Sequence, residues 1–319
     1  MPDYSIFGGC LRADMHFPEL PAATGCTPDW TVRTIDSPAQ LGNAELLGEE
    51  PLGHGVYVRS YKWPSGWRVA FDDTGIFDIS RDGSDITWWP GPESQVDIAR
   101  IDVVGRVLAM AMHAAGKLCL HGSGVALGGD GVAFVAPKFH GKSTLALALA
   151  QAGGRLMNDD NVPIDTGTPA MIRPGAPRVR LWSDSVDRLG GDRLQPARGS
   201  DEKFNLSSLP EDLVMRDAVP LAAVYLLTPV ASNGGDAVVR TPLAPVPSAI
   251  ALVRHAKLGA LLGKSESAVV LDRAVSLATV APVYALHVVR DFDRMHEVVA
   301  QLMEWHGCPM PAARAGAAG

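Results

Sequence analysis

The sequence of 319 residues has few cysteines, few aromatic residues and no long apolar segment. Its four cysteines (Cys10, Cys26, Cys119 and Cys308) show no C-x-x-C spacing, so we expect neither a zinc site nor a disulfide framework. No apolar run reaches roughly 18 residues, and the N-terminus lacks the basic and apolar segments of a signal peptide. We therefore expect a cytoplasmic protein without membrane contact.

The chain also lacks an excess of basic residues. It has 28 Lys and Arg against 35 Asp and Glu, a net charge of −7, and no dense basic cluster, which argues against nucleic acid as a partner. Hydrophobic residues make up 47% of the chain, which is typical of a globular protein with ample core. The length favours about two domains. Composition and length are compatible with a homo-oligomer as well as with a monomer.

Residues 1–92 are rich in glycine, proline and aromatic residues. Short alternating runs in this part are interrupted by turn signals such as Pro64-Ser65-Gly66 and Asp72-Asp73-Thr74-Gly75. Such spacing predicts an N-terminal, mainly antiparallel β domain.

The remainder of the chain, residues 93–310, alternates between helical and strand patterns and predicts an α/β domain. It opens with an amphipathic helix expected over 98–115, with Ile101 on the apolar stripe. The tail over 311–319 is expected to be disordered. Further strands are expected at 118–127, 132–135, 155–164, 221–227 and 283–289, and further helices at 143–152, 247–262, 266–280 and 292–305.

The most informative segment is a short apolar strand, a tight loop and then Gly141-Lys142-Ser143-Thr144 at the start of an apolar helix. Unpaired backbone N–H groups and the dipole at a helix N-terminus favour an anion. Gly141 lets the chain approach a phosphate closely. Lys142 can reach the β- and γ-phosphates, and the hydroxyl of Ser143 can coordinate magnesium. The segment therefore matches the second half of a Walker A motif.

The first half of that motif differs from the G-x-x-x-x-G-K-[ST] pattern, because Ala136 stands where its first glycine belongs. A structural turn that contains Gly-Lys-Ser is the alternative to a phosphate site. The strand before the loop and the helix after it favour the phosphate site. The residues that we expect to contact the nucleotide are Pro137, Lys138, Phe139, His140, Gly141, Lys142, Ser143 and Thr144.

Two adjacent carboxylates, Asp159 and Asp160, end the segment that follows the loop helix. We expect the apolar residues before them to form a strand beside the loop strand, which would place the carboxylates near bound phosphates. Magnesium needs hard oxygen ligands there, and phosphoryl transfer needs a group that accepts the hydroxyl proton. A solvated turn or a helix cap is the alternative.

Two further features are less specific. His121, in Leu120-His121-Gly122-Ser123-Gly124-Val125, is surrounded by small residues that leave room for a ligand, although a buried histidine is the alternative. A basic stretch is interpreted as a solvated face, with an acceptor-binding surface as the alternative; it consists of Arg254, His255, Lys257 and Lys264.

Together, these segments resemble the HPr kinase/phosphorylase family, whose P-loop core is shared with ATP-dependent phosphoenolpyruvate carboxykinase. Residues 120–164 show His-Gly, a Gly-rich hairpin, Gly-Lys-Ser, a helix, Gly-x-Arg-Leu and Asp-Asp-x-Val in the order of that family. Phe7-Gly8, the segment 17–21 and the segment 178–182 resemble the HPr-kinase-like serine kinases found beside peptide-modification genes, including kinases that tailor lasso peptides.

The resemblance implies a P-loop kinase core and roles for single residues. Lys142 would hold the phosphates, and Ser143 would contact magnesium. Of the two carboxylates, Asp159 would be the base, and Asp160 would be the second metal contact. The implied cofactors are ATP and Mg²⁺.

The resemblance also assigns positions around the transferred phosphate. His121 would lie beside it, and Arg180 would be a cation near the phosphates or the acceptor. Thr144 replaces an acidic residue of the true HPr kinases, so HPr is not the expected substrate and phosphorylase activity is not expected.

The function implied is transfer of the terminal phosphate of Mg-ATP to a hydroxyl, on a serine of a ribosomally made, lasso-type peptide. A non-catalytic nucleotide-sensing module and a small-metabolite kinase on the same core are the alternatives.

Overall fold

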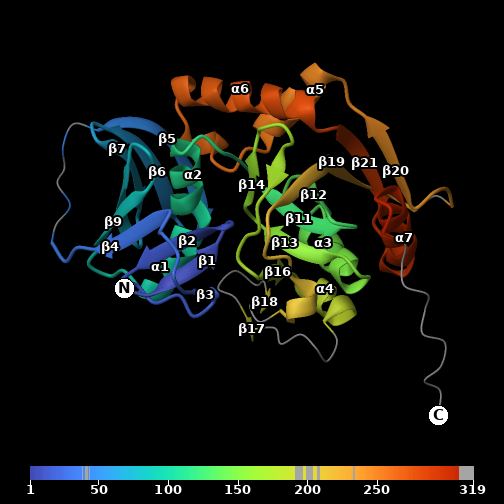
Figure 1. Ribbon diagram of the computed structural model, residues 1–319, viewed down its shortest axis with the longest axis horizontal. Helices are drawn as coiled ribbons and strands as arrows, with labels where there is room; N and C mark the ends of the chain where they lie inside the picture. Colours follow the sequence, from blue (N-terminus) through green and yellow to red (C-terminus); the bar gives the residue numbers. More distant parts are fainter. Residues whose placement is uncertain are drawn as a thin grey trace, which may run out of the picture.

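The computed structural model describes residues 1–37, 39, 42, 44–190, 197–198, 204–206, 209–232 and 234–308. The predicted tail over 311–319 lies outside the described residues. Within them the chain is a mixed α/β protein with three sheets, in agreement with the predicted fold class at that level. Figure 1 shows a β-rich N-terminal part beside a part in which helices cover a second sheet.

The first sheet contains nine strands in the order β3-β1-β2-β4-β9-β8-β7-β6-β5. Consecutive strands from β5 to β9 pair antiparallel, as the turn signals predict, whereas β4 pairs in parallel with β2 and β9. Alternate residues of β8, such as Phe77 and Ile79, are buried, which is the period of a half-buried strand. The strands are β1 (Asp3–Ile6), β2 (Gly9–Ala13), β3 (Ala22–Ala23), β4 (Trp30–Thr34), β5 (Glu45–Gly53), β6 (Val56–Trp63), β7 (Gly66–Phe71), β8 (Gly75–Ser80) and β9 (Asp85–Pro90).

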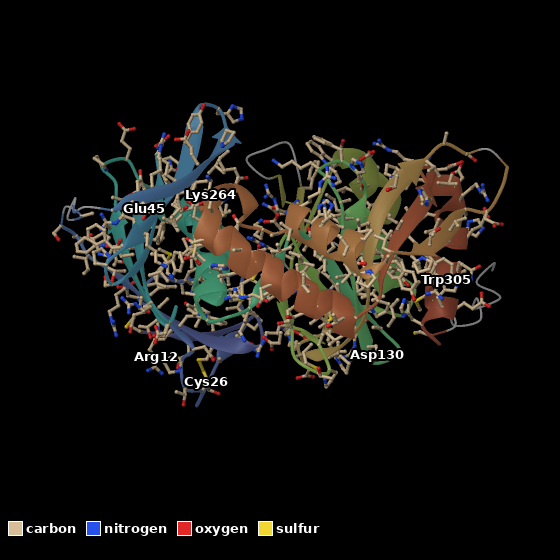
Figure 2. All side chains as sticks on the ribbon, turned by 90° about the horizontal axis from the view of Figure 1, so that it is seen from above. Arg12, Cys26, Glu45, Asp130, Lys264 and Trp305 are labelled. Carbon is tan, nitrogen blue, oxygen red and sulfur yellow. A yellow bond between two sulfur atoms is a disulfide. The ribbon has the colours of Figure 1, made fainter. Side chains whose placement is uncertain are left out.

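Cys10 and Cys26 form a disulfide, so the expectation of no disulfide is wrong. Strand β1 pairs with both β2 and β3, and this pairing brings the two cysteines together with their Cα atoms 6.2 Å apart. Figure 2 labels Cys26 at the outer edge of the N-terminal sheet. The pair has no motif spacing, since 16 positions separate its members, so only the fold reveals it.

The helix predicted over 98–115 is a continuous helical segment with a π-helical turn at its centre. It consists of α1 (Val96–Asp102), the π-turn η1 (Val103–Val107) and α2 (Leu108–Ala114). Val104 and Leu108 are buried as expected, but Ile101 is 42% exposed. A π-turn bonds residues i and i+5 in place of i and i+4, so it shifts the phase of the apolar stripe and leaves Ile101 off the core face.

The second sheet positions the loop motif. Its order is β10-β14-β15-β19-β12-β11-β13, and β21 pairs with β19 and β20. The loop strand β12 is parallel to β19, which is parallel to β21. The strands are β10 (Leu118–Leu120), β11 (Gly122–Leu127), β12 (Asp130–Val135), β13 (Arg155–Asp159), β14 (Val162–Asp165), β15 (Met171–Ile172), β19 (Val219–Val230), β20 (Val238–Pro242) and β21 (Val283–Val289). A small third sheet has the order β16 (Val179–Leu181), β18 (Phe204–Leu206), β17 (Ala197–Arg198).

Strand β13 does not lie beside the loop strand, contrary to the prediction. It pairs antiparallel with β11, and β11 separates it from β12 because the β11–β12 hairpin already occupies that edge. The predicted single strand over 155–164 is also interrupted. Asp160 has a φ of 75°, which ends β13 at Asp159 before β14 begins at Val162.

Helices cover both faces of the second sheet. One apolar cluster joins it to α3 (Lys142–Gln151) and α7 (Met295–Trp305). A second cluster joins it to α5 (Pro245–Arg254), α6 (Lys264–Val280) and the first sheet. The remaining helical segments are α4 (Ser183–Leu189), η2 (Glu211–Leu213), η3 (Gly259–Leu261) and η4 (Phe292–Arg294).

Polar contacts also join the two main sheets through η3 and α6. Ser60 of β6 donates to the carbonyl of Leu261, and Lys62 of the same strand pairs with Glu266 of α6 at 3.2 Å. Among the described residues, no helix has both the length and the apolar character needed to cross a bilayer.

Candidate functional site

The loop between β12 and α3 leads into the N-terminus of a helix, where unpaired N–H groups and the helix dipole favour an anion. Strand β12 ends at Val135, and α3 begins at Lys142 after Gly141, which has a φ of 84°. That conformation favours glycine, and a Cβ built there would have no neighbour within 4 Å. The start of α3 therefore faces open space in which a phosphate could approach its backbone N–H groups.

The side chain of Lys142 is held inside the loop. Its Nζ donates to the carbonyls of Ala136 and Pro137, at 2.9 and 3.0 Å, and the residue is only 8% exposed. The loop therefore curls around a buried cation in the first turn of α3. Ala136, which replaces the expected glycine, is buried and contributes its carbonyl to this arrangement.

Asp159 receives three hydrogen bonds from three different elements. Its Oδ1 accepts from Ser143 Oγ of α3 and from Ser123 Oγ of β11, both at 2.7 Å. Its Oδ2 accepts from the backbone N–H of Arg180 in β16 at 3.0 Å. The contacts fix this carboxylate against the first turn of the loop helix.

Asp160 lies in a different set of contacts. Its Oδ1 is 3.1 Å from Nδ1 of His121, and its Oδ2 accepts from Lys257 Nζ at 2.7 Å. Burial raises the pKa of Asp160, but Lys257 and His121 reverse that effect, so the pKa lies well below the usual range. The carboxylate is therefore ionised throughout the neutral range.

The loop after α5 completes this cluster. The backbone N–H of His121 donates to the carbonyl of His255 at 2.8 Å, and the N–H of Lys257 donates to that of Cys119 at 2.9 Å. Burial and neighbouring cations lower the pKa of His255 to about 4, so its ring is neutral near pH 7.

The basic stretch is not a single solvated face. The Lys257 side chain is only 6% exposed and pairs with Asp160, whereas Lys264 at the start of α6 is exposed. Lys257 thus belongs to the candidate site, and its buried ion pair is the reason that the solvated interpretation fails for it.

The other predicted loop residues lie at the rim. Pro137 and Lys138 are exposed, and His140 is half-buried with Nδ1 2.9 Å from the carbonyl of Lys138. Phe139 is 63% exposed and stacks on Trp182. Thr144 Oγ1 is 2.9 Å from Ser185 Oγ of α4.

Three site residues were not expected from the sequence. Ser123 could have been found, because it lies in the same small-residue segment as His121. Lys257 was part of a basic stretch that could be interpreted from the sequence either as a solvated face or as an acceptor-binding surface. Asn161 gave none: it follows the two carboxylates, is 4% exposed, and donates to the carbonyls of Val104 and Gly105 at 3.0 and 2.7 Å.

Asn161 connects the turn of the two carboxylates to the π-turn η1. In a π-turn the carbonyls are displaced from the regular α-helical ladder, so they can accept from another donor. This contact fixes the residue that directly follows Asp160 against the helical segment.

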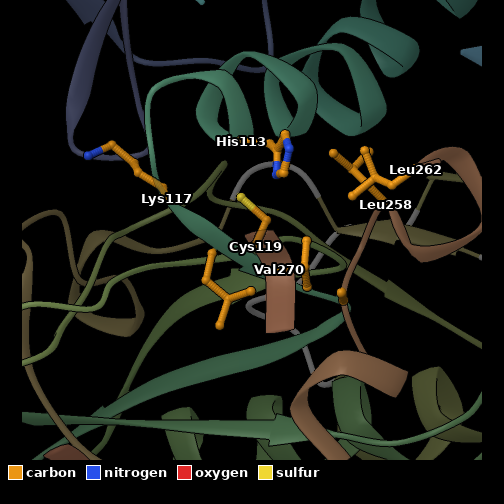
Figure 3. A pocket seen from close by; sticks show the side chains of 8 residues that line it. His113, Lys117, Cys119, Leu258, Leu262 and Val270 are labelled. Carbon is orange, nitrogen blue, oxygen red and sulfur yellow. The ribbon is translucent and has the colours of Figure 1, made fainter. Parts of the chain in front are cut away.

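A small pocket elsewhere in the chain is not a second candidate site. Figure 3 shows it between α2, β10 and α6, with His113, Lys117, Cys119, Leu258, Leu262 and Val270 at its wall. Its volume of about 10 Å³ has room for about one water molecule. Burial raises the pKa of Cys119 to about 12, which makes the thiol a poor nucleophile.

Comparison with known proteins gives little further guidance. No protein-family model matches the chain, and no curated protein is similar to it. Among solved structures it is similar to the Hpr(Ser) kinase/phosphatase from Coxiella burnetii, at 10% identity and a TM-score of 0.32, over 59% of this chain and 96% of that one. A similarity this low does not assign the chain to a family.

Proposed function

We propose that the chain is a Mg-ATP-dependent kinase that transfers the terminal phosphate to a hydroxyl. The observation that carries the proposal is the hydrogen bond of 2.7 Å between Ser143, in the first turn of the loop helix, and Asp159. It places a hydroxyl and a carboxylate beside a buried lysine at an anion-binding helix start. These are the groups that a Walker-type phosphate site requires.

The residues fit a nucleotide with magnesium. Ser143 and Asp159 supply hard oxygen ligands of the kind that Mg²⁺ prefers, and Mg²⁺ bound there would neutralise charge on the phosphates. Lys142 would exchange its contacts with loop carbonyls for phosphate oxygens, and the N–H groups at the start of α3 would bind the remaining oxygens. Binding and orientation by these groups supply most of the acceleration in phosphoryl transfer.

We propose that His121 and Asp160 accept the proton of the acceptor hydroxyl. His121 is about one-third exposed, and its Nδ1 faces Asp160, which leaves Nε2 directed away from that carboxylate. The acceptor oxygen forms a bond to the terminal phosphorus, the bond to the bridging oxygen breaks, the proton passes to Nε2 and ADP leaves. Asp160 orients the ring and stabilises the imidazolium.

This division reverses the roles that the resemblance implies for the two carboxylates. Asp159 was predicted as the base and Asp160 as a metal contact beside Ser143. The contacts favour the opposite assignment, because Ser143 reaches Asp159 whereas Asp160 lies beside His121.

The acceptor that we propose is a serine of a ribosomally made, lasso-type peptide, and we propose a cytoplasmic location because ATP is the proposed donor. A small hydroxyl metabolite is the second candidate. A nucleotide sensor without catalysis is less well supported, since it would not need the buried ion pair between Lys257 and Asp160 beside His121.

The test is transfer of labelled terminal phosphate from Mg-ATP to serine-containing peptides and to small hydroxyl compounds. We expect label on a serine hydroxyl, no transfer by Lys142→Ala, and normal transfer by Asp130→Asn. Asp130 is an exposed carboxylate at the opposite end of β12 from the loop. Equal transfer by wild type and Lys142→Ala would overturn the proposal.

A further inference from the structure

An aromatic pair lies at the rim of the phosphate loop and has no role in the chemistry proposed above. The rings of Phe139 and Trp182 are 5.1 Å apart between centroids, with an interplanar angle of 24°. Phe139 has a φ of 68° and is 63% exposed. A large apolar ring is thus held in an uncommon backbone conformation with much of its surface open to solvent.

The pair lies on the Asp159 side of the site. Strand β16 brings the backbone N–H of Arg180 to Asp159 at 3.0 Å, and Trp182 follows directly after the last residue of β16, at the start of α4. The first turn of α3 contacts the same region, because Thr144 of α3 meets Ser185 of α4. The path from Asp159 along β16 therefore leads past the first turn of α3 to the aromatic rings.

The acceptor groups lie on the other side. Asp160, His121 and Lys257 form their cluster with β10 and the loop after α5, whereas Asp159 forms its contacts with α3, β11 and β16. The phosphate that is transferred has to lie near His121. The nucleoside, at the far end of the triphosphate, then has to extend away from His121 toward β16.

We infer that Phe139 and Trp182 form a stacking platform for the nucleobase of the bound nucleoside triphosphate. This inference rests on the proposed phosphate site. The exposed face of Phe139 takes the π-face of the base, and Trp182 supports the ring from behind. Stacking tolerates different bases because each has a π-face, so ATP and GTP bind with similar affinity.

The test compares Mg-ATP with Mg-tripolyphosphate, which has the phosphates but no base, by calorimetry. We expect Phe139→Ala to raise the Kd of Mg-ATP about tenfold, the scale of a lost base stack, and to leave the Kd of Mg-tripolyphosphate unchanged. Trp182→Phe keeps a ring and should retain most of the ATP affinity. Tyr57→Ala, an exposed aromatic residue in the first sheet, is the matched control and should change neither Kd.

The outcomes separate this inference from the proposed function. If Phe139→Ala raises the Kd of both ligands equally, the ring maintains the conformation of the loop. If it changes neither Kd, the base lies elsewhere. Either result overturns the platform and leaves the proposed phosphate site in place. An unchanged ATP affinity with a raised KM for the peptide would assign the rings to the acceptor and also overturn it. Failure of wild type to bind either ligand would remove the phosphate site, and the platform with it.

Discussion

Ser143 at the start of α3 and Asp159 at the end of β13 are joined by a hydrogen bond of 2.7 Å between Oγ and Oδ1. The neighbouring carboxylate, Asp160, has no share in that contact and pairs instead with His121 and Lys257. The side chains of these two adjacent aspartates thus lie in different environments, because the positive φ of Asp160 turns the chain between them.

The two aspartates should give different kinetic defects. We expect Asp159→Asn to raise the Mg²⁺ concentration for half-maximal rate at least about tenfold, since it removes a proposed ligand charge. We expect Asp160→Asn to lower kcat about 10²-fold or more with little change in Mg²⁺ dependence. Initial rates across a Mg²⁺ titration measure both. The reverse pattern would restore the assignment of Asp159 as base.

Lys257 should control the protonation of Asp160. Burial raises the pKa of Asp160 and Lys257 is the main opposing charge, so Lys257→Met should raise that pKa. The carboxylate then protonates at higher pH, and the acid limb of the pH–rate profile moves to higher pH. Lys264→Met, at an exposed position on α6, is the control and should leave the profile in place. Coincident profiles for Lys257→Met and wild type would contradict a role for this pair.

Asp102 should make the protein less stable as pH rises. Burial raises its pKa to about 7, although Thr74 donates to it at 2.6 Å. The folded state therefore binds a proton that the unfolded chain, with a pKa near 3.8, has released. The resulting stability is complete below the unfolded pKa and is lost as pH rises through 7.

Asp102→Asn removes this dependence. We expect the variant to exceed wild type in unfolding free energy by on the order of 4 kcal/mol at about pH 8, with the difference falling below about 1 kcal/mol near about pH 4. Urea unfolding at several pH values measures it. The comparison of variant with wild type cancels the contribution of other groups, such as His255, and a pH-independent difference would refute the assignment.

The disulfide should stabilise the N-terminal sheet. Cross-links that close loops of this length, 16 positions, contribute about 3 kcal/mol. Reductant should therefore lower the Tm of wild type. The same reductant should have no effect on Cys26→Ser, and Cys308→Ser should behave as wild type because Cys308 is a free thiol. If the Tm of wild type is the same with and without reductant, the predicted stabilisation by the disulfide is wrong.

Local patterns predicted local structure well. The strand expected over 283–289 is β21, and the loop helix begins at Lys142, one residue from the expected start. Apolar periodicity and turn residues act over a few positions, so they report these elements directly. The same signals could not place β13, because pairing with β11 rather than β12 depends on which strand already occupies the sheet edge.

In the candidate site, too, the features that are local in sequence could be predicted and the contacts between distant residues could not. The loop motif and the two carboxylates are contiguous in sequence and could be found there. The contact between Lys257 and Asp160 spans 97 positions, and the bonds from Asn161 to Val104 and Gly105 span 57 and 56. No pattern within a short window encodes such contacts, since they arise when α5 and η1 pack against the sheet.

The central claim is that the loop before α3 binds Mg-ATP, and calorimetry of wild type beside Lys142→Ala tests it most directly. A thermal melt supports the measurement, because a ligand at a hundred times its Kd adds about 2.7 kcal/mol to the folded state. We predict saturable, magnesium-dependent binding by wild type that is lost in Lys142→Ala. No binding by wild type, or equal binding by both proteins, would contradict the claim.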